Sequence, residues 1–201
     1  MKSLKELYRI GPGPSSSHTL GPQRAASLFK ERYPMAHHFE VELFGSLALT
    51  GKGHLTDYII IKTMQPKDCV VLFKNRRDLK HPNTMHLMAM DEQHKLLGEW
   101  TVYSIGGGAI QIEGEESKEG ADVYPHHSMK EIEAYCEAHS MELWEYVNHF
   151  DPLDDYMDTI MNQMMATVDG GLEKEGVLPG DLKLKRIARE LKEKADVCRS
   201  A

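Results

Sequence analysis

The stretch Pro14-Ser15-Ser16-Ser17-His18-Thr19 stands directly before Gly21-Pro22, where we expect a helix to begin. Proline fits the first position of a helix because the N–H that it lacks has no partner there. The free N–H groups of a first helical turn, four hydroxyls and an imidazole together suit a small anion such as a carboxylate. The alternative is a linker, or serines that serve only as caps and turns. The prolines stiffen the loop and His18 lies inside it, which favours a binding site.

A second polar group, Gly51-Lys52-Gly53-His54-Leu55-Thr56-Asp57, follows downstream. Its two glycines allow the backbone to approach a ligand closely. His54 is a candidate general base or acid near neutral pH, and Asp57 is a candidate partner for His54 or for a substrate ammonium group. The alternative is a glycine-rich hairpin turn between two strands, with Thr56 and Asp57 as turn residues.

A third group, Tyr103-Ser104-Ile105-Gly106-Gly107-Gly108, ends a predicted strand. Its glycines lack the spacing of a dinucleotide-binding or P-loop motif, so we interpret them as a bulge or sharp bend. Together the three groups indicate a site for a small, polar, carboxylate-bearing molecule, with two histidines that can move protons.

Composition excludes several other classes of protein. The chain has 201 residues, 41% of them hydrophobic, and a net charge of −7 with both signs mixed along it. We therefore expect neither a nucleic-acid-binding face nor a membrane anchor, and the absence of a secretion signal at the N-terminus predicts a cytoplasmic protein. Cys69, Cys136 and Cys198 lie far apart without a CxxC spacing, so we expect reduced thiols and no metal site in this chain.

Periodicity predicts an α+β protein with an α/β part over 1–122 and a helical part over 123–201. In the first part we expect a helix over 22–33 and a loop over 113–122. Strands are expected over 39–49, 58–61, 69–73, 85–90, 99–105 and 109–112, although 58–61 is short enough to be a helix instead. In the second part we expect helices beginning at Ser128, Ser140 and Asp151-Pro152, and a last one over 182–197. Two apolar stripes should face inward there: Leu153, Met157, Ile160, Met164 and Val168, and then Leu184, Ile187, Ala188 and Leu191.

Several long motifs resemble the β portion of bacterial iron–sulfur-dependent L-serine dehydratase, in the same order along the chain. They are Gly13–Thr19 with Gly21-Pro22, Phe44–His54, Trp100–Gly108, and Gly176–Gly180 followed by Leu182–Arg186. The last pair resembles the early helices of the family's α domain in its fused form. The family usually has glycine where this chain has Leu55, and a side chain there would crowd the turn or shift His54.

The resemblance implies an N-terminal domain with a mixed sheet, similar to an allosteric substrate-binding domain, followed by the first helices of a catalytic α domain. It implies conversion of L-serine to pyruvate and ammonia, a reaction of serine catabolism and gluconeogenesis. It also implies that the enzyme is a homodimer. It also implies a 4Fe-4S cluster in the complete enzyme, with ligands outside this chain in a missing α domain or subunit. His54 and His18 would be catalytic, and the substrate would be bound by Ser15, Ser17, Thr19, Thr56, Asp57 and Ser104.

A binding module is the competing hypothesis. The family's β domain resembles the allosteric substrate-binding domain of some phosphoglycerate dehydrogenases, so the chain could sense serine without catalytic residues of its own. The same hydroxyl-rich loop would serve either role. As a fragment or single subunit, the chain is expected to be colourless and inactive alone.

Overall fold

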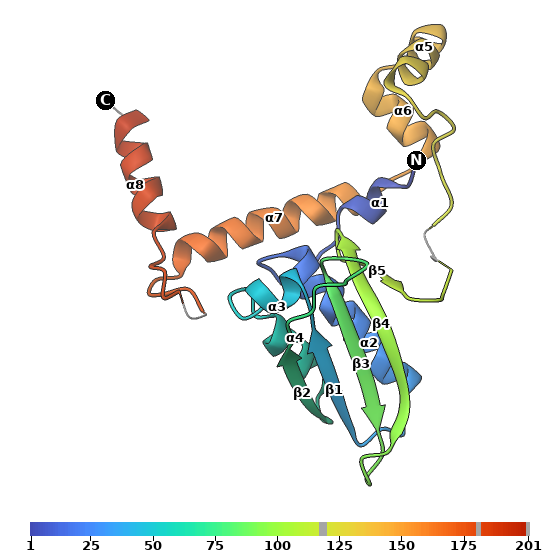
Figure 1. Ribbon diagram of the computed structural model, residues 1–201. Helices are drawn as coiled ribbons and strands as arrows, with labels where there is room; N and C mark the ends of the chain where they lie inside the picture. Colours follow the sequence, from blue (N-terminus) through green and yellow to red (C-terminus); the bar gives the residue numbers. More distant parts are fainter. Residues whose placement is uncertain (117–119, 180–181, 200–201) are drawn as a thin grey trace. The chain divides into compact units, whose positions relative to one another are not determined.

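The computed structural model describes residues 1–116, 120–179 and 182–199, which form two compact units (Figure 1). The sheet unit comprises Gly11–Ser117 with Glu175–Ile187. The helical unit comprises Met1–Ile10, Lys118–Lys174 and Ala188–Ala201. All the candidate site residues belong to the sheet unit.

The sheet unit is built on one mixed five-stranded sheet with the strand order β2-β1-β3-β4-β5. Its strands are β1 (His38–Leu43), β2 (Asp68–Phe73), β3 (Thr84–Met90), β4 (Leu96–Gly106) and β5 (Ala109–Ile112). β1 pairs in parallel with β2 and antiparallel with β3, and the remaining pairs are antiparallel. The predicted α+β class is therefore confirmed.

Two helices, α2 (Gly21–Arg32) and α4 (Thr56–Met64), cover one face of this sheet (Figure 1). Alternate residues of β1 and β3 point into the core, because successive side chains of a strand face opposite sides. Phe29 of α2 lies among them, with its ring centroid 5.1 Å from that of Trp100 and 5.9 Å from that of Phe39. The fully buried core residues of α2, β1 and β3 are Ala25, Ala26, Phe29, Phe39, Val41, Leu43, Met85, Leu87 and Ala89. The helix predicted over 22–33 thus supplies the main cover of the sheet.

The segment between β1 and β2 differs from the expectation. The strand predicted over 39–49 ends at Leu43, and Ser46–Thr50 form a short helix, α3. The strand predicted over 58–61 is wrong, because these residues lie in α4, as the helical alternative had it. Ile60 and Met64 are four residues apart and fully buried on the inner side of that helix. Since an apolar run of four residues fits a strand or a helix equally well, packing on the sheet decided between them.

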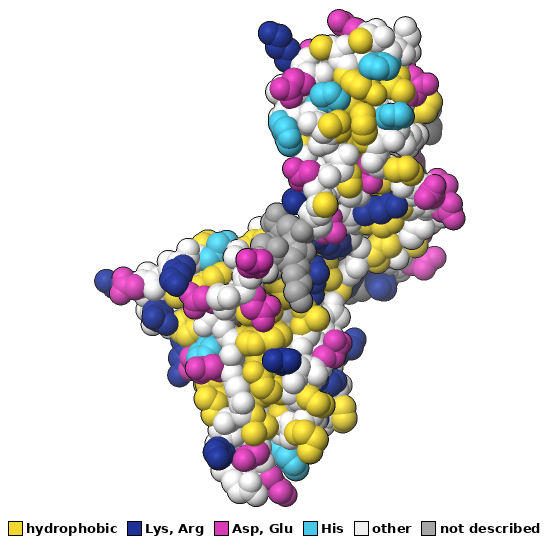
Figure 2. Space-filling view, turned by 90° about the vertical axis from the view of Figure 1, so that its right-hand side faces the viewer, with side chains coloured by type: hydrophobic (Ala, Val, Ile, Leu, Met, Phe, Trp, Pro, Cys, Tyr) yellow, Lys and Arg dark blue, Asp and Glu magenta, His cyan; other side chains and the backbone are white. Residues whose placement is uncertain are grey.

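The helical unit contains α1 (Leu4–Leu7), α5 (Met129–His139), α6 (Leu143–Phe150), α7 (Tyr156–Glu173) and α8 (Ala188–Arg199). The predicted start at Ser128 is confirmed, with a capping box between Ser128 and Glu131. Tyr124, Cys136 and Tyr146 form a small buried cluster. Figure 2 shows hydrophobic and histidine side chains side by side over α5 and α6, where the His126 ring lies 4.8 Å from that of Tyr135.

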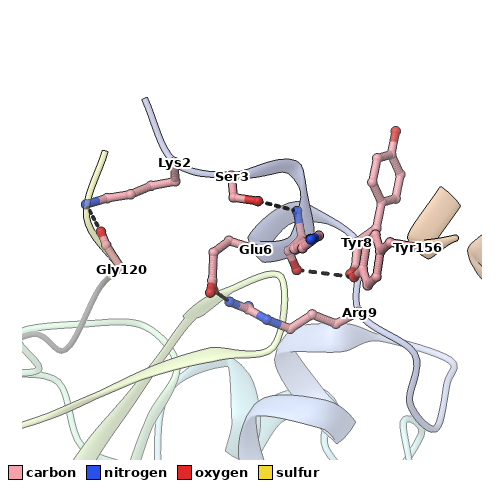
Figure 3. A network of polar contacts seen from close by, with 8 residues as sticks. Lys2, Ser3, Glu6, Tyr8, Arg9, Gly120 and Tyr156 are labelled. Atoms are coloured by element: carbon pink, nitrogen blue, oxygen red, sulfur yellow. Dashed lines mark hydrogen bonds and ion pairs between the residues drawn. The ribbon is translucent and has the colours of Figure 1, made fainter. Parts of the chain in front are cut away.

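The N-terminal segment belongs to the helical unit through polar contacts (Figure 3). Ser3 caps α1 by accepting a hydrogen bond from the N–H of Lys5, and the Tyr156 hydroxyl donates to the carbonyl of Tyr8. The buried carboxylate of Asp151 accepts hydrogen bonds from the Ser3 hydroxyl and the Leu4 N–H, both 2.8 Å long. Residues more than 140 positions apart are thereby joined.

Three expected helix starts in the second half of the chain are wrong. Ser140 ends α5 in the left-handed conformation, and α6 begins after a separate capping box between Glu142 and Glu145. Asp151 ends α6, since the following Pro152 disfavours a helical conformation at the residue before it, and α7 starts at Tyr156. The last helix starts at Ala188 rather than at Leu182.

The two apolar stripes are only partly buried. Leu153 and Ile160 are buried, whereas Met164, Val168, Leu184, Ile187 and Leu191 are 46–56% exposed. The loop predicted over 113–122 lies partly outside the described residues, and residues 113–116 and 120–122 contain no helix or strand. Among the described residues, no helix has the length and apolar character needed to span a membrane.

Candidate functional site

Two imidazoles from distant parts of the sequence lie together in the sheet unit. The ring centroids of His18 and His54 are 4.5 Å apart, with an angle of 32° between the ring planes. His18 belongs to a π-helical turn, η1 (Ser16–Leu20), which precedes α2, and His54 lies in the turn between α3 and α4. The predicted convergence of these two segments is therefore confirmed. Single π-helical turns occur often at functional sites.

His18 is nearly enclosed, with only 9% of its surface exposed. Its Nδ1 lies 3.3 Å from the Ser15 hydroxyl. Its Nε2 lies 2.9 Å from the Thr50 hydroxyl and 3.3 Å from the Ser46 hydroxyl. Both ring nitrogens thus have polar partners, which allows the imidazole to be buried at low cost.

The surroundings of His18 favour its neutral form. Burial lowers the pKa of His18 below its usual value of 6.5, and the neighbouring His54 lowers it further, against a smaller opposing effect of Ser46. Burial acts in this direction because it penalises the charged imidazolium.

His54 is more accessible than His18. Its Nδ1 lies 2.9 Å from the carbonyl oxygen of Thr50. Because a carbonyl oxygen only accepts hydrogen bonds, Nδ1 must carry the hydrogen. The neutral ring then has its lone pair on Nε2, the arrangement that a general base requires.

The turn that carries His54 joins two helices, and not the two strands of the alternative interpretation. The Thr56 N–H donates to the carbonyl of Gly51, with 2.9 Å between the atoms. Leu55 adopts the left-handed conformation, with φ 59° and ψ 34°, which glycine adopts without strain on a Cβ atom. This conformation explains why the family usually has glycine here. In this chain the turn forms with leucine at the same position.

Two candidate residues use their hydroxyls to hold the hydroxyl-rich loop. Thr19 is buried, and its Oγ1 lies 2.6 Å from the carbonyl oxygen of Pro12 and 2.5 Å from that of Ser15, which share its single hydrogen. Ser104 is fully buried, and its Oγ donates to the carbonyl of Ser17 over 2.9 Å. β4 is thus tied to η1, and the predicted substrate contacts of Thr19 and Ser104 stay predictions.

The remaining candidates have different surroundings. Thr56 is fully buried, and its hydroxyl has no hydrogen-bond partner among the described residues. Asp57 is half-buried, and its carboxylate accepts a hydrogen bond from the N–H of Tyr58, 2.9 Å away. Ser15 and Ser17 are half-buried. Their roles toward a substrate also stay predictions.

Sequence reasoning missed Thr50 and Ser46 as individual site residues. Both hydroxyls approach the Nε2 of His18, because residues four apart lie on the same side of a helix. The signal was present in the spacing but was hidden by the strand predicted over this segment. The bend predicted at Gly106-Gly107-Gly108 is confirmed as the turn between β4 and β5, with a register shift beside it.

The chain's cysteines offer little for a metal centre. Among the described residues, no group of three or more histidine, cysteine or acidic side chains is placed to hold a metal ion. Burial raises the pKa of Cys69 to about 12, because it penalises the charged thiolate.

The fold and the paired imidazoles define an α+β domain with a candidate proton-transfer site. A profile of the serine dehydratase beta chain family matches residues 3–68 and 61–115. The chain therefore belongs to the serine dehydratase beta chain family.

Relatives with the name L-serine dehydratase match almost the whole chain. One from Haemophilus influenzae is 30% identical over 95% of this chain and 54% of its own length. One from Helicobacter pylori is 29% identical over 94% of this chain and 53% of its own length. L-serine dehydratase 1 of Escherichia coli is 31% identical over 96% of this chain and 54% of its own length. The chain thus spans about half the length of these relatives.

The lowered pKa of His18 predicts that acid destabilises the fold. Below about pH 6.5 an unfolded histidine binds a proton while buried His18 stays neutral, so the free energy of unfolding falls as the pH falls toward the folded pKa. We expect His18→Gln to show a smaller loss of stability than the wild type between about pH 7.5 and about pH 5. Urea unfolding at a series of pH values measures this. Equal pH dependence of the two proteins would contradict it.

Proposed function

We propose that this chain supplies the proton-transfer and substrate-orienting residues of an L-serine dehydratase. The observation that carries the proposal is the His18–His54 pair, in a chain whose relatives are named L-serine dehydratase. One imidazole is held neutral and nearly buried, and the other presents Nε2. This is the asymmetry expected of a site in which one base takes a proton and its neighbour does not compete for it.

The reaction that this site serves is the removal of water and then ammonia from L-serine. Nε2 of His54 takes the α-proton and returns it to the departing β-hydroxyl, which leaves as water, so that the product is 2-aminoacrylate. That enamine tautomerises to an imine, which water hydrolyses to pyruvate and ammonia. Because His18 is held neutral, His54 accepts the positive charge without a cation beside it.

Substrate orientation is assigned to the groups around the imidazoles. The half-buried Ser15 and Ser17 would bind the carboxylate, and Asp57 would pair with the ammonium group. Thr56 would use its unpartnered hydroxyl in the same site. Thr19 and Ser104 would act mainly by holding the loop that carries Ser15 and Ser17.

The 4Fe-4S cluster of the proposal does not fit this chain's residues. Such clusters are held by several cysteine thiolates, and no suitable group occurs among the described residues. We therefore place the cluster ligands in the α domain or subunit that would complete the enzyme, and no step above uses the cluster. A homodimer in the cytoplasm, active in serine catabolism and gluconeogenesis, completes the proposal.

The division of the enzyme predicts that this chain is colourless and inactive alone. After anaerobic incubation of the purified chain with iron and sulfide, we expect no brown species and no pyruvate from L-serine. Co-expression with the C-terminal half of the Escherichia coli relative is expected to give both colour and activity. An absorbance scan, an iron determination and a pyruvate assay measure these. A brown species with stoichiometric iron, or pyruvate formed by the chain alone, would refute the division.

A further inference from the structure

One residue, Thr50, contacts both imidazoles of the site through different atoms. Its hydroxyl oxygen lies 2.9 Å from Nε2 of His18. Its carbonyl oxygen lies 2.9 Å from Nδ1 of His54. The same hydroxyl lies 2.9 Å from the carbonyl oxygen of Ser46, one turn earlier in α3. Thr50 was not among the residues that the sequence indicated for the site.

We assign the protons from these three contacts; the Ser46 hydroxyl, 3.3 Å from Nε2 of His18, can accept from the same nitrogen. The Thr50 hydroxyl has a single hydrogen, and the carbonyl of Ser46 can only accept it, as in the usual bond of a helical threonine to the residue four positions earlier. The lone pairs of the hydroxyl then face Nε2 of His18, which must donate. A neutral imidazole carries one hydrogen, so Nδ1 of His18 is left as the acceptor for the Ser15 hydroxyl.

The contact to His54 also assigns a hydrogen, but to Nδ1 rather than to Nε2. The Thr50 carbonyl accepts from Nδ1 of His54, so the hydrogen lies on Nδ1 and the lone pair lies on Nε2. One residue thus holds His18 with its hydrogen on Nε2 and His54 with its hydrogen on Nδ1.

We infer that Thr50 is a positioning residue that selects opposite tautomers in His18 and His54. The structural part of this inference stands on the hydrogen bonds alone. Its catalytic consequence rests on the proposed function: with its hydrogen on Nδ1, His54 presents a basic Nε2 to the substrate.

The two contacts differ in a way that makes the inference testable. The contact to His18 uses a side chain, which mutation removes, whereas the contact to His54 uses the backbone, which mutation leaves in place. Thr50→Val has nearly the same shape as threonine but lacks the hydroxyl. We therefore expect Thr50→Val to change the tautomer of His18 and to leave that of His54 unaltered, and we expect Thr50→Ser to restore the wild-type state.

Nitrogen-15 NMR of the purified full chain, labelled at histidine, reads the tautomers directly. In the wild type we expect hydrogen on Nε2 of His18 and on Nδ1 of His54. In Thr50→Val the population of His18 with hydrogen on Nε2 should fall. The matched control is Thr63→Val, which removes the same kind of helical bond, from the Thr63 hydroxyl to the carbonyl of Ile59 in α4. This control should leave both histidines unchanged.

Three outcomes would overturn the inference. These are wild-type His18 with its hydrogen on Nδ1, an unchanged His18 in folded Thr50→Val, and a simultaneous change of both histidines, which would indicate a displaced helix. The wild-type measurement tests the inference even where Thr50→Val fails to fold.

A second measurement separates the inference from the proposed function. In the complete enzyme we expect Thr50→Val to lower kcat by about 10-fold with little change in KM, within the hundredfold or more that general-base catalysis contributes. Thr50→Ser should recover most of this loss. An unchanged kcat alongside the expected NMR change would refute the catalytic consequence. Failure of the wild-type complex to act on L-serine would refute the proposed function and leave the tautomer result standing.

Discussion

Replacement of His54 by alanine is expected to lower the turnover of L-serine by about a hundredfold or more while leaving the fold intact. The loss follows because Nε2 of His54 is the proposed base, and because His18, whose pKa is lowered by burial and by His54, is a poor substitute. The fold should survive because His54 is only half-buried and lies outside the apolar core. Pyruvate formation by the complete enzyme and circular dichroism measure the two effects.

The matched control is His37→Ala. This change removes an exposed imidazole of the same unit that is not among the candidate site residues. We expect its turnover to match that of the wild type. Near-normal turnover in His54→Ala would show that His54 is only a turn residue. If L-serine still bound and altered the enzyme's activity in that variant, the result would favour the regulatory alternative.

The second large effect is expected from Gly45→Ala, which should lower the free energy of unfolding by roughly 3 kcal/mol or more. Gly45 has φ 56° and ψ −127°, a conformation that residues with a Cβ atom rarely adopt. A Cβ atom there would also overlap the carbonyl oxygen of Pro82, which accepts a hydrogen bond from the N–H of Ser46. Backbone strain and steric overlap therefore add.

This glycine also directs the candidate site, since α3 begins directly after it and carries Ser46 and Thr50 to His18. Urea unfolding of the chain measures the loss of stability. The control is Gly53→Ala in the neighbouring turn, where an added Cβ atom would lie 3.5 Å from the carbonyl oxygen of Thr50, an ordinary contact. We expect a change below about 1 kcal/mol for Gly53→Ala. Similar stabilities for the two variants would contradict the argument.

The sequence by itself determined the α+β class, most of the strands and the two segments that supply the imidazoles. These features depend on local patterns: alternation in β1 and β3, a capping box at Ser128, and histidines set among hydroxyls and glycines. Such patterns act over a few neighbouring residues, so they can be recognised without knowledge of what packs against them.

Only the tertiary structure decided what those residues contact. The apolar run at 58–61 became a helix because α4 packs on the sheet. The Asp151 carboxylate, expected to begin a helix, instead accepts hydrogen bonds from the N-terminal segment. His18 and His54 are 36 positions apart, and their approach, like the contacts of Thr50, depends on how α3 follows β1. The hydroxyls of Thr19 and Ser104 donate to backbone carbonyls of the hydroxyl-rich loop, contacts that the sequence did not indicate. The physical reason is that buried donors and acceptors need hydrogen-bond partners. Those partners come from segments that are distant in the sequence, so local patterns do not reveal them.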